Sequence, residues 1–268
     1  MDKNSSVAVI LGSAYQHSLP HELDLEQATV ETKWGEQQVY TTKKSGKSRA
    51  YVIFRHGLPH KLLPNQINYR AQAQALQQLG CGALLVTSSV GVMDASLPLF
   101  KPMLLSDIIM LDNRLPNGEA CTMFPEPDAN HGHLVLNEGL FSKALNRQLQ
   151  KIGEGDVATS NNQIVFAYAG GPRTKTKAEN RIWPQLGAQV NSMTLAPEVI
   201  LANELEIPCA GLVIGHKYSV PDIKNPESGQ ALADTLDSSR AAMESIIKKF
   251  LEQGQPVSFG NQIYRFDE

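Results

Sequence analysis

The sequence lacks a large excess of either positive or negative charge. Among its 268 residues, 24 Lys and Arg stand against 27 Asp and Glu, a formal net charge of −3. We therefore do not expect a nucleic-acid partner bound through bulk positive charge, although a local anion site fits this balance. No apolar run approaches the roughly 18 residues that a membrane helix needs, so no membrane partner is expected. The apolar residues 7–11 suit a first strand better than a signal peptide.

Cysteine is scarce, and its spacing fits neither a disulfide framework nor a zinc site. Cys81, Cys121 and Cys209 lie far apart, and no C-x-x-C is present. A reducing cytoplasm is the expected location. His56 and His60 have i, i+4 spacing without an H-E-x-x-H motif, so no metal is expected there. A P-loop, a complete G-x-G-x-x-G and a G-x-S-x-G elbow are also missing from the sequence.

What the sequence does have is an alternation of apolar strand and helix patterns. Apolar types make up 42% and charged types 19%, which is enough for a packed core. We predict one α/β domain over 1–268, with a mixed, largely parallel central sheet flanked by helices. The expected strands are 7–11, 28–32, 38–42, 50–54, 83–87, 103–111, 190–193 and 209–214. The expected helices are 65–79, 138–151, 177–186, 197–205 and 231–251.

Hydroxyls, one guanidinium and one imidazole follow the predicted strands. Ligands of such folds bind beyond the carboxyl ends of the strands. Several hydroxyls beside a single Arg suit an oxyanion such as phosphate, because Arg gives a charged bidentate contact. The competing explanation is that each hydroxyl merely caps a helix or turn. The residues at these ends are Ser13, Arg55, His56, Ser88, Ser89, Met193, Thr194 and Lys217.

Longer motifs run through the chain in a characteristic order. Residues 55–71 read R-H-G-x-x-H-x-x-x-P-x-x-x-N-Y-x-A, and further motifs stand at 87–91, 171–173, 191–194 and 197–199. This pattern resembles the trimeric purine nucleoside phosphorylases and, most closely in motif form, the methylthioadenosine phosphorylases. The resemblance implies their fold and a homotrimer. It also implies phosphorolysis of purine nucleosides, 5′-methylthio nucleosides included, with inorganic phosphate as co-substrate and no metal or other cofactor.

The resemblance also implies roles for individual residues. Phosphate would be held by Ser13, Arg55, His56, Ser88, Ser89 and Thr194. Met193 would meet the ribose hydroxyls. His133 stands where the family places a histidine that a neighbouring subunit directs at the 5′ group of the sugar. The other explanation for His133 is a solvated loop histidine.

The chain departs from the family pattern at the base. Thr174 and Lys175 replace a Phe and a following Glu or Ser, so stacking on the base should weaken. Lys217 stands where Asn or Asp usually reads the purine ring, and lysine can only donate. That favours a 6-oxopurine over adenine, unless Lys217 makes a structural ion pair instead. Ala14 in the first turn replaces a glycine, which should loosen the hold on phosphate.

Two alternatives remain open at this point. The first is a paralogue with altered or lost base specificity, which binds a phosphate-containing or nucleoside ligand without efficient turnover. The second is a purely structural subunit of a trimer, which leaves the retained phosphate residues unexplained. The residues that discriminate the paralogue from an active phosphorylase are Thr174, Lys175 and Lys217.

Overall fold

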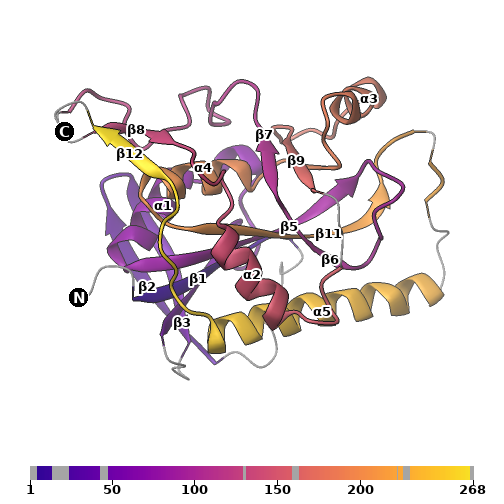
Figure 1. Ribbon diagram of the computed structural model, residues 1–268, viewed down its shortest axis with the longest axis horizontal. Coiled ribbons are helices and arrows are strands. Elements are labelled where there is room, and N and C mark those ends of the chain that lie inside the picture. Colours follow the sequence, from indigo (N-terminus) through magenta and orange to yellow (C-terminus); the bar gives the residue numbers. More distant parts are fainter. Residues whose placement is uncertain are drawn as a thin grey trace.

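The computed structural model describes residues 5–13, 24–42, 48–128, 131–158, 163–221, 223–225 and 230–265, with only the backbone given for 230–234. Its centre is a ten-stranded mixed sheet in the order β2-β3-β4-β1-β5-β10-β9-β7, with β11 added beside β5 and β6 beside β11. Helices cover both faces (Figure 1). The expected single α/β architecture is confirmed. Ala14 lies outside the described residues.

The elements follow the chain closely. The large sheet contains β1 (Ser6–Leu11), β2 (Leu25–Thr32), β3 (Gly35–Thr42), β4 (Arg49–Phe54), β5 (Cys81–Val92), β6 (Pro102–Leu104), β7 (Asp107–Ile109), β9 (Val165–Tyr168), β10 (Val190–Ser192) and β11 (Cys209–Tyr218). A two-stranded sheet pairs β8 (Gly132–Val135) with β12 (Gln262–Arg265). The helices are α1 (Tyr69–Gln78), α2 (Lys143–Ile152), α3 (Lys177–Gln185), α4 (Ala196–Glu204) and α5 (Gln230–Gln253), with a 3₁₀ turn at Pro64–Gln66.

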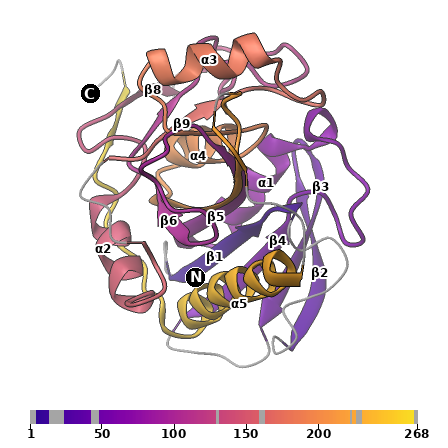
Figure 2. The same cartoon turned by 90° about the vertical axis from the view of Figure 1, so that its right-hand side faces the viewer.

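The sheet is buried on both sides because its central strands are apolar throughout. In β1, Val7, Val9 and Leu11 point into one core and the intervening Ala8 and Ile10 into the other. The first core is closed by apolar residues of α2 and α5, and the second by those of α1 and α4. Figure 2 shows α5 crossing one face of the sheet, with α1 and α4 on the other.

The strand register brings distant segments to one edge. β1 lies between β4 and β5, parallel to both, with Leu11 opposite Phe54 and Ile10 opposite Val86. β11 also runs parallel to β5. The residues after β1 and β4 and the carboxyl-terminal halves of β5 and β11 therefore meet at the same end of the sheet.

Some element boundaries differ from the sequence prediction. The expected strand at 103–111 is two strands, because β6 pairs with β11 whereas β7 pairs with β9. The expected helix at 138–151 begins only at Lys143, where the Ser142 hydroxyl accepts a hydrogen bond from the Leu145 amide and caps it. The short strands β8, β9 and β12 were not predicted.

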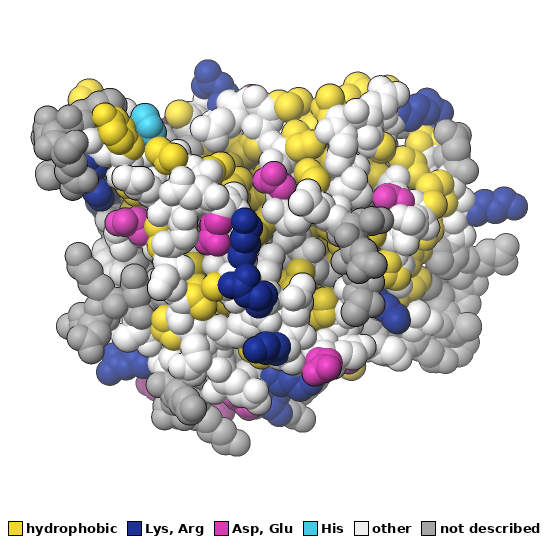
Figure 3. All heavy atoms as spheres, in the orientation of Figure 1, with side chains coloured by type: hydrophobic (Ala, Val, Ile, Leu, Met, Phe, Trp, Pro, Cys, Tyr) yellow, Lys and Arg dark blue, Asp and Glu magenta, His cyan; other side chains and the backbone are white. Residues whose placement is uncertain are grey.

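The outer face of α2 is cationic. Its buried positions are Leu145 and Leu149, and the exposed positions Lys143, Arg147 and Lys151 follow at four-residue spacing. A row of Lys and Arg side chains lies over this helix at the middle of Figure 3. No helix in the described ranges is long and apolar enough to cross a membrane.

Candidate active site

A cavity of about 660 Å³ opens at the shared strand ends. Ten of the eleven residues selected from the sequence line it, and His133 is the exception. These ten come from six separate stretches of chain, which the sheet register brings together. They are Ser13, Arg55, His56, Ser88, Ser89, Thr174, Lys175, Met193, Thr194 and Lys217.

Arg55 forms one wall and is almost completely buried, at 1% exposure. Its Nε donates to Glu198, a buried carboxylate in the first turn of α4, and its Nη1 donates to the Thr87 carbonyl at 2.9 Å. Its Nη2 is buried and has no partner in the described chain. The guanidinium is thus held by two fixed contacts and keeps donor capacity for a ligand in the cavity.

Gly12 is required by the close approach of β1 to Arg55. A Cβ at this position would lie 2.9 Å from Nη1 of Arg55 and 3.1 Å from the Thr87 carbonyl. The Gly12 amide donates to the Thr87 hydroxyl at 3.1 Å, and that hydroxyl donates to the Ile10 carbonyl at 3.0 Å. These contacts fix the first turn of the site against β5.

His56 enters the cavity as a neutral ring. Its Nδ1 lies 2.8 Å from the Leu62 carbonyl, which can only accept, so Nδ1 carries the hydrogen and Nε2 keeps a lone pair. The ring stacks on His60, with centroids 4.3 Å apart. Burial, aided by the charge on Arg55, lowers the pKa of His56 to about 4. At neutral pH its Nε2 can therefore accept a hydrogen bond but not donate one.

The hydroxyl cluster comes from β5 and the segment after β10. The Ser88 hydroxyl contacts the Ser89 carbonyl at 3.0 Å and the Ser192 hydroxyl at 3.2 Å. Thr194 is buried, and the next residue, Leu195, has a positive φ of 76°. A branched hydrophobic residue adopts this conformation only under constraint from its surroundings, and such strain gathers at binding sites.

Lysines occupy the part of the cavity that the resemblance assigns to the base. Lys175 lies in the loop before α3, and Lys217 lies near the end of β11. Burial lowers the pKa of Lys175, and the charge of Lys217 lowers it further. The two ammonium groups are thus close enough to influence each other. Neither forms an ion pair with a described residue, so the alternative of a structural ion pair for Lys217 is not found there.

His216 is a lining residue that follows a predicted strand and to which the sequence assigned no role. Gly215 pairs with Val90 and Lys217 with Gly91, so His216 is the extra residue of a β-bulge. Its Nε2 lies 3.4 Å from the hydroxyl of Ser239, which itself donates to a carbonyl of α5 at 2.8 Å. Nε2 must then carry the hydrogen, which leaves Nδ1 as an acceptor. Burial lowers the pKa of His216 and favours this neutral form.

A smaller chamber of about 240 Å³ adjoins the main cavity, and the two share Ser88, Ser89 and His216 as lining residues. Its other side is formed by α5, where Leu236 and Met243 supply apolar surface. The chamber therefore extends the site from Ser88 and Ser89 to the helix α5.

His133 lies elsewhere in the molecule. It was expected on a loop, but it is part of β8 and stands opposite Tyr264 of β12, with the two rings 5.3 Å apart. It does not line the cavity of its own chain. This position fits both explanations, since a residue supplied to a neighbouring subunit lies outside its own cavity and the side chain of His133 is also exposed.

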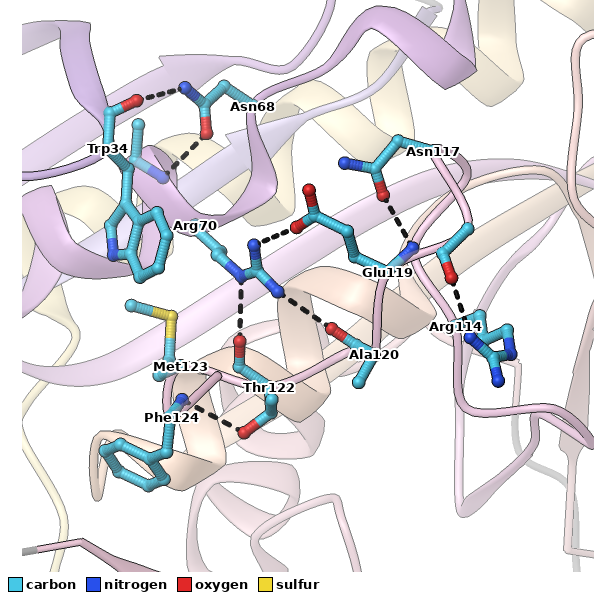
Figure 4. Close-up of polar contacts among 12 residues, drawn as sticks. Trp34, Asn68, Arg70, Arg114, Asn117, Glu119, Ala120, Thr122, Met123 and Phe124 are labelled. Atoms are coloured by element: carbon cyan, nitrogen blue, oxygen red, sulfur yellow. Dashed lines mark hydrogen bonds and ion pairs between the residues drawn. The ribbon is translucent and has the colours of Figure 1, made fainter. Parts of the chain in front are cut away.

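A larger hollow of about 770 Å³ lies beside α1 and the loop at 115–120. Its main cation, Arg70, is already engaged: it donates to the carbonyls of Thr122 (2.8 Å) and Ala120 (2.9 Å), pairs with Glu119 and stacks on Trp34 (Figure 4). These contacts hold the loop at 119–122 against the domain, so the guanidinium of Arg70 is already engaged by the protein. Despite its size, this hollow holds none of the predicted site residues.

No group of three or more potential metal ligands from His, Cys, Asp and Glu occurs among the described residues. The buried Glu198 was missed as a site residue because its partner lies 143 positions away. Its signals in the sequence were its place in the motif at 197–199 and in the first turn of a helix, just after Pro197. His216 follows a predicted strand but was given no role, because a bulge cannot be predicted from an apolar run.

Comparison with known proteins assigns the relatives of this chain. Residues 6–252 match the family model described as the phosphorylase superfamily. The chain is 30% identical over 255 residues to a probable S-methyl-5′-thioinosine phosphorylase of Methanopyrus kandleri, covering 94% of each chain. It is 29% identical over 254 residues to the 6-oxopurine nucleoside phosphorylase of Pyrococcus furiosus, covering 90% of this chain and 89% of the relative.

Solved structures share the fold at lower identity. A methylthioadenosine phosphorylase from an antarctic soil metagenomic library aligns with a TM-score of 0.76 at 22% identity, covering 92% of this chain and 85% of that one. An adenosine/methylthioadenosine phosphorylase mutant from Schistosoma mansoni, in complex with adenine, gives a TM-score of 0.77 at 20% identity, covering 92% and 89%.

Proposed function

This chain belongs to the phosphorylase superfamily, and on that premise we propose that it cleaves purine nucleosides with phosphate, 5′-methylthio nucleosides included. The products are the free base and ribose or methylthioribose 1-phosphate. The observation that carries the proposal is that ten predicted site residues, from six separate stretches of the chain, line one cavity. Relatives named for this chemistry, acting on methylthioinosine, methylthioadenosine and 6-oxopurine nucleosides, support it.

In this proposal phosphate binds where Arg55, Ser13 and the Ser88–Ser89 segment meet. The free Nη2 of Arg55 donates to one oxygen, and nearby hydroxyls and amides satisfy the others. Nε2 of His56 accepts from the hydroxyl of a protonated phosphate. A phosphate oxygen then bonds to C1′ while the bond from C1′ to the base breaks, and the phosphate charge stabilises the cation-like sugar. Met193 borders the ribose.

Base recognition in this proposal depends on Lys217. An ammonium donates to a ring nitrogen or an exocyclic oxygen and cannot accept from the adenine amino group. The 6-oxopurine nucleosides are therefore the better substrates. No metal or organic cofactor takes part, because phosphate itself supplies both the nucleophile and the charge.

We also propose a cytoplasmic homotrimer in which His133 completes a neighbour's site near the 5′ group of the sugar. The family resemblance supports the trimer. The position of His133 on β8, outside the cavity of its own chain, is compatible with such a role.

The test is phosphate-dependent base release from adenosine, inosine, guanosine and their 5′-methylthio forms. Replacing Arg55 with Ala should reduce kcat/KM by about 10- to 150-fold, because a hydrogen bond to a charged group contributes roughly 1.5–3 kcal/mol. Arg147→Ala on the exposed face of α2 is the matched control. Arg55→Lys keeps the buried charge and guards against misfolding. Unchanged phosphate dependence in both Arg55 variants would refute the proposed site.

One other function has specific support. Thr174, Lys175 and Lys217 depart from the family pattern at the base, which suits a paralogue that binds ligand without efficient turnover. Phosphate binding in calorimetry, together with no base release from any of the six nucleosides, would favour that function.

A further inference from the structure

The cavity is cationic at its base end and lacks the opposite charge. Its lining includes Arg55, Lys175 and Lys217, and no Asp or Glu occurs among the described lining residues. The charge of Arg55 is neutralised by Glu198, which does not itself line the cavity. The two lysines have no such partner in the described parts of the chain.

The acidic residue with the largest influence on Lys175 is already engaged. Glu179 raises the pKa of Lys175 less than burial and Lys217 lower it. Both of its carboxylate oxygens accept from Arg173, at 2.7 and 2.8 Å. Two ammonium groups on separate elements thus face one space in which neither is neutralised. Lys175 is half-buried and Lys217 is exposed, so water screens their repulsion in the empty cavity. A ligand that brings negative charge and displaces that water is attracted to both ammonium groups.

The hydrogen-bond donors of the two lysines determine which groups the facing edge of the ligand must present. Each ammonium has three donors and no acceptor. Adenine presents an amino donor on its six-membered ring, and hypoxanthine presents one exocyclic oxygen. A 2,6-dioxopurine presents two exocyclic oxygens and loses a ring proton more readily to become an anion. The neutral His216, with Nδ1 as acceptor, can receive a remaining ring N–H.

We propose that the preferred substrate is a 2,6-dioxopurine nucleoside of the xanthosine class, whose oxygens are bound by Lys175 and Lys217. The inference rests on the proposed function and deepens it by naming the base. It extends the role of Lys217 to a pair of lysines that act together on an electron-rich ring edge.

The lysine pair also acts on the bond that breaks. As a phosphate oxygen bonds to C1′, the bond from C1′ to N9 breaks and its electron pair passes to the purine. That pair delocalises onto the exocyclic oxygens, where the two ammonium groups stabilise it, so the base leaves as an anion. Because this negative charge grows in the transition state, the stabilisation by the two lysines should raise kcat as well as lower KM.

The first test compares kcat/KM for xanthosine, inosine and adenosine in wild type and lysine variants. Xanthosine should exceed inosine by about tenfold or more, which is the discrimination expected from one extra charged hydrogen bond. Lys175→Met and Lys217→Met should each remove most of that advantage. Lys177→Met, exposed two residues away and outside the cavity, should leave it unchanged. Equal activity on xanthosine and inosine, or equal losses on both in the variants, would overturn the inference.

The second test separates this inference from the proposed function. Calorimetry measures binding of free xanthine and hypoxanthine to wild type and to the three Lys→Met variants, with and without phosphate. Tighter xanthine binding that depends on Lys175 and Lys217 supports the inference even if no nucleoside is cleaved. A second phosphate ion that competes with xanthine would mean that the lysines form another phosphate site, and the inference would be wrong.

Discussion

Glu198 and Arg55 form a buried ion pair that joins the first turn of α4 to the end of β4. Glu198 is 2% exposed and Arg55 is 1% exposed, so neither charge has water as a substitute partner. The pair fixes one edge of the guanidinium and leaves Nη2 for a ligand. The carboxylate therefore positions the guanidinium of Arg55, although it does not line the cavity itself.

Replacing Glu198 with Ala should destabilise the protein by about 3–5 kcal/mol, the usual cost of leaving one buried charge unpaired. The matched control is Glu244→Ala, which removes an exposed pair with Arg240 and should change stability by about 0.5 kcal/mol or less. Urea unfolding at neutral pH measures both. Similar values for the two variants would mean that the Arg55 pair contributes no more than a surface contact.

His56 should make stability depend on pH in acid. Its folded pKa of about 4 lies below the ordinary value of 6.5, so the unfolded state binds more protons between these values. The stabilising contribution is complete above about pH 6.5 and is lost as the pH falls through 4. In His56→Asn, the fall in unfolding free energy from pH 7 to pH 4.5 should be shallower than in wild type.

His131→Asn provides the control for that experiment, because it removes a histidine that packs on Phe124 and does not line the cavity. The pH profile of this variant shows how much of the change comes from the loss of any histidine. A slope in His56→Asn as steep as that of wild type would show that His56 accepts a proton freely in the folded protein.

The choice between adenine and hypoxanthine nucleosides should favour the oxopurine. An ammonium from Lys217 facing the adenine amino group opposes two donors, and an unpaired buried polar group costs about 1–3 kcal/mol, or roughly 5- to 150-fold. Matched kcat/KM values for methylthioadenosine and methylthioinosine decide this. Efficient cleavage of the adenine substrate would mean that Lys217 points away from the base.

Light scattering should give a mass three times that of the 29.3 kDa chain. If His133 serves a neighbour's site, His133→Ala should raise KM for 5′-methylthio substrates without changing the measured mass. His131→Ala, two residues away on the same segment, is the control. A stable monomer with full activity would contradict both the assembly and the role of His133.

The sequence predicted the residues that line the cavity better than the residues that hold them in place. Ser13, Arg55 and Ser88 could be placed together because parallel strands end at one edge of a sheet, so order along the chain is enough. Glu198 could not be found in that way, because its pairing is set by how α4 packs against the sheet. The same holds for β8, which is only four residues long and pairs with a strand at the far end of the chain.

At the base end of the cavity, the part played by His216 could not be predicted, for a different reason. A β-bulge at Gly215–Lys217 shifts the register by one residue, and one residue decides which side chain turns toward the cavity. The family resemblance therefore assigned a role to Lys217 and none to His216, although both line the site. An apolar run predicts a strand, but it contains no signal for an inserted residue.

The helix α3, which follows Lys175, contains no buried residue, whereas α4, which follows Thr194, buries seven. Substitutions near Lys175 therefore cost little folding free energy, while those near Thr194 disturb the core. If the proposed roles hold, evolution can change the choice of base at the periphery of this domain without changing the proposed phosphate site at its centre. Libraries that vary residues 173–176 should accordingly yield folded proteins with new base preferences far more often than libraries that vary residues 193–196.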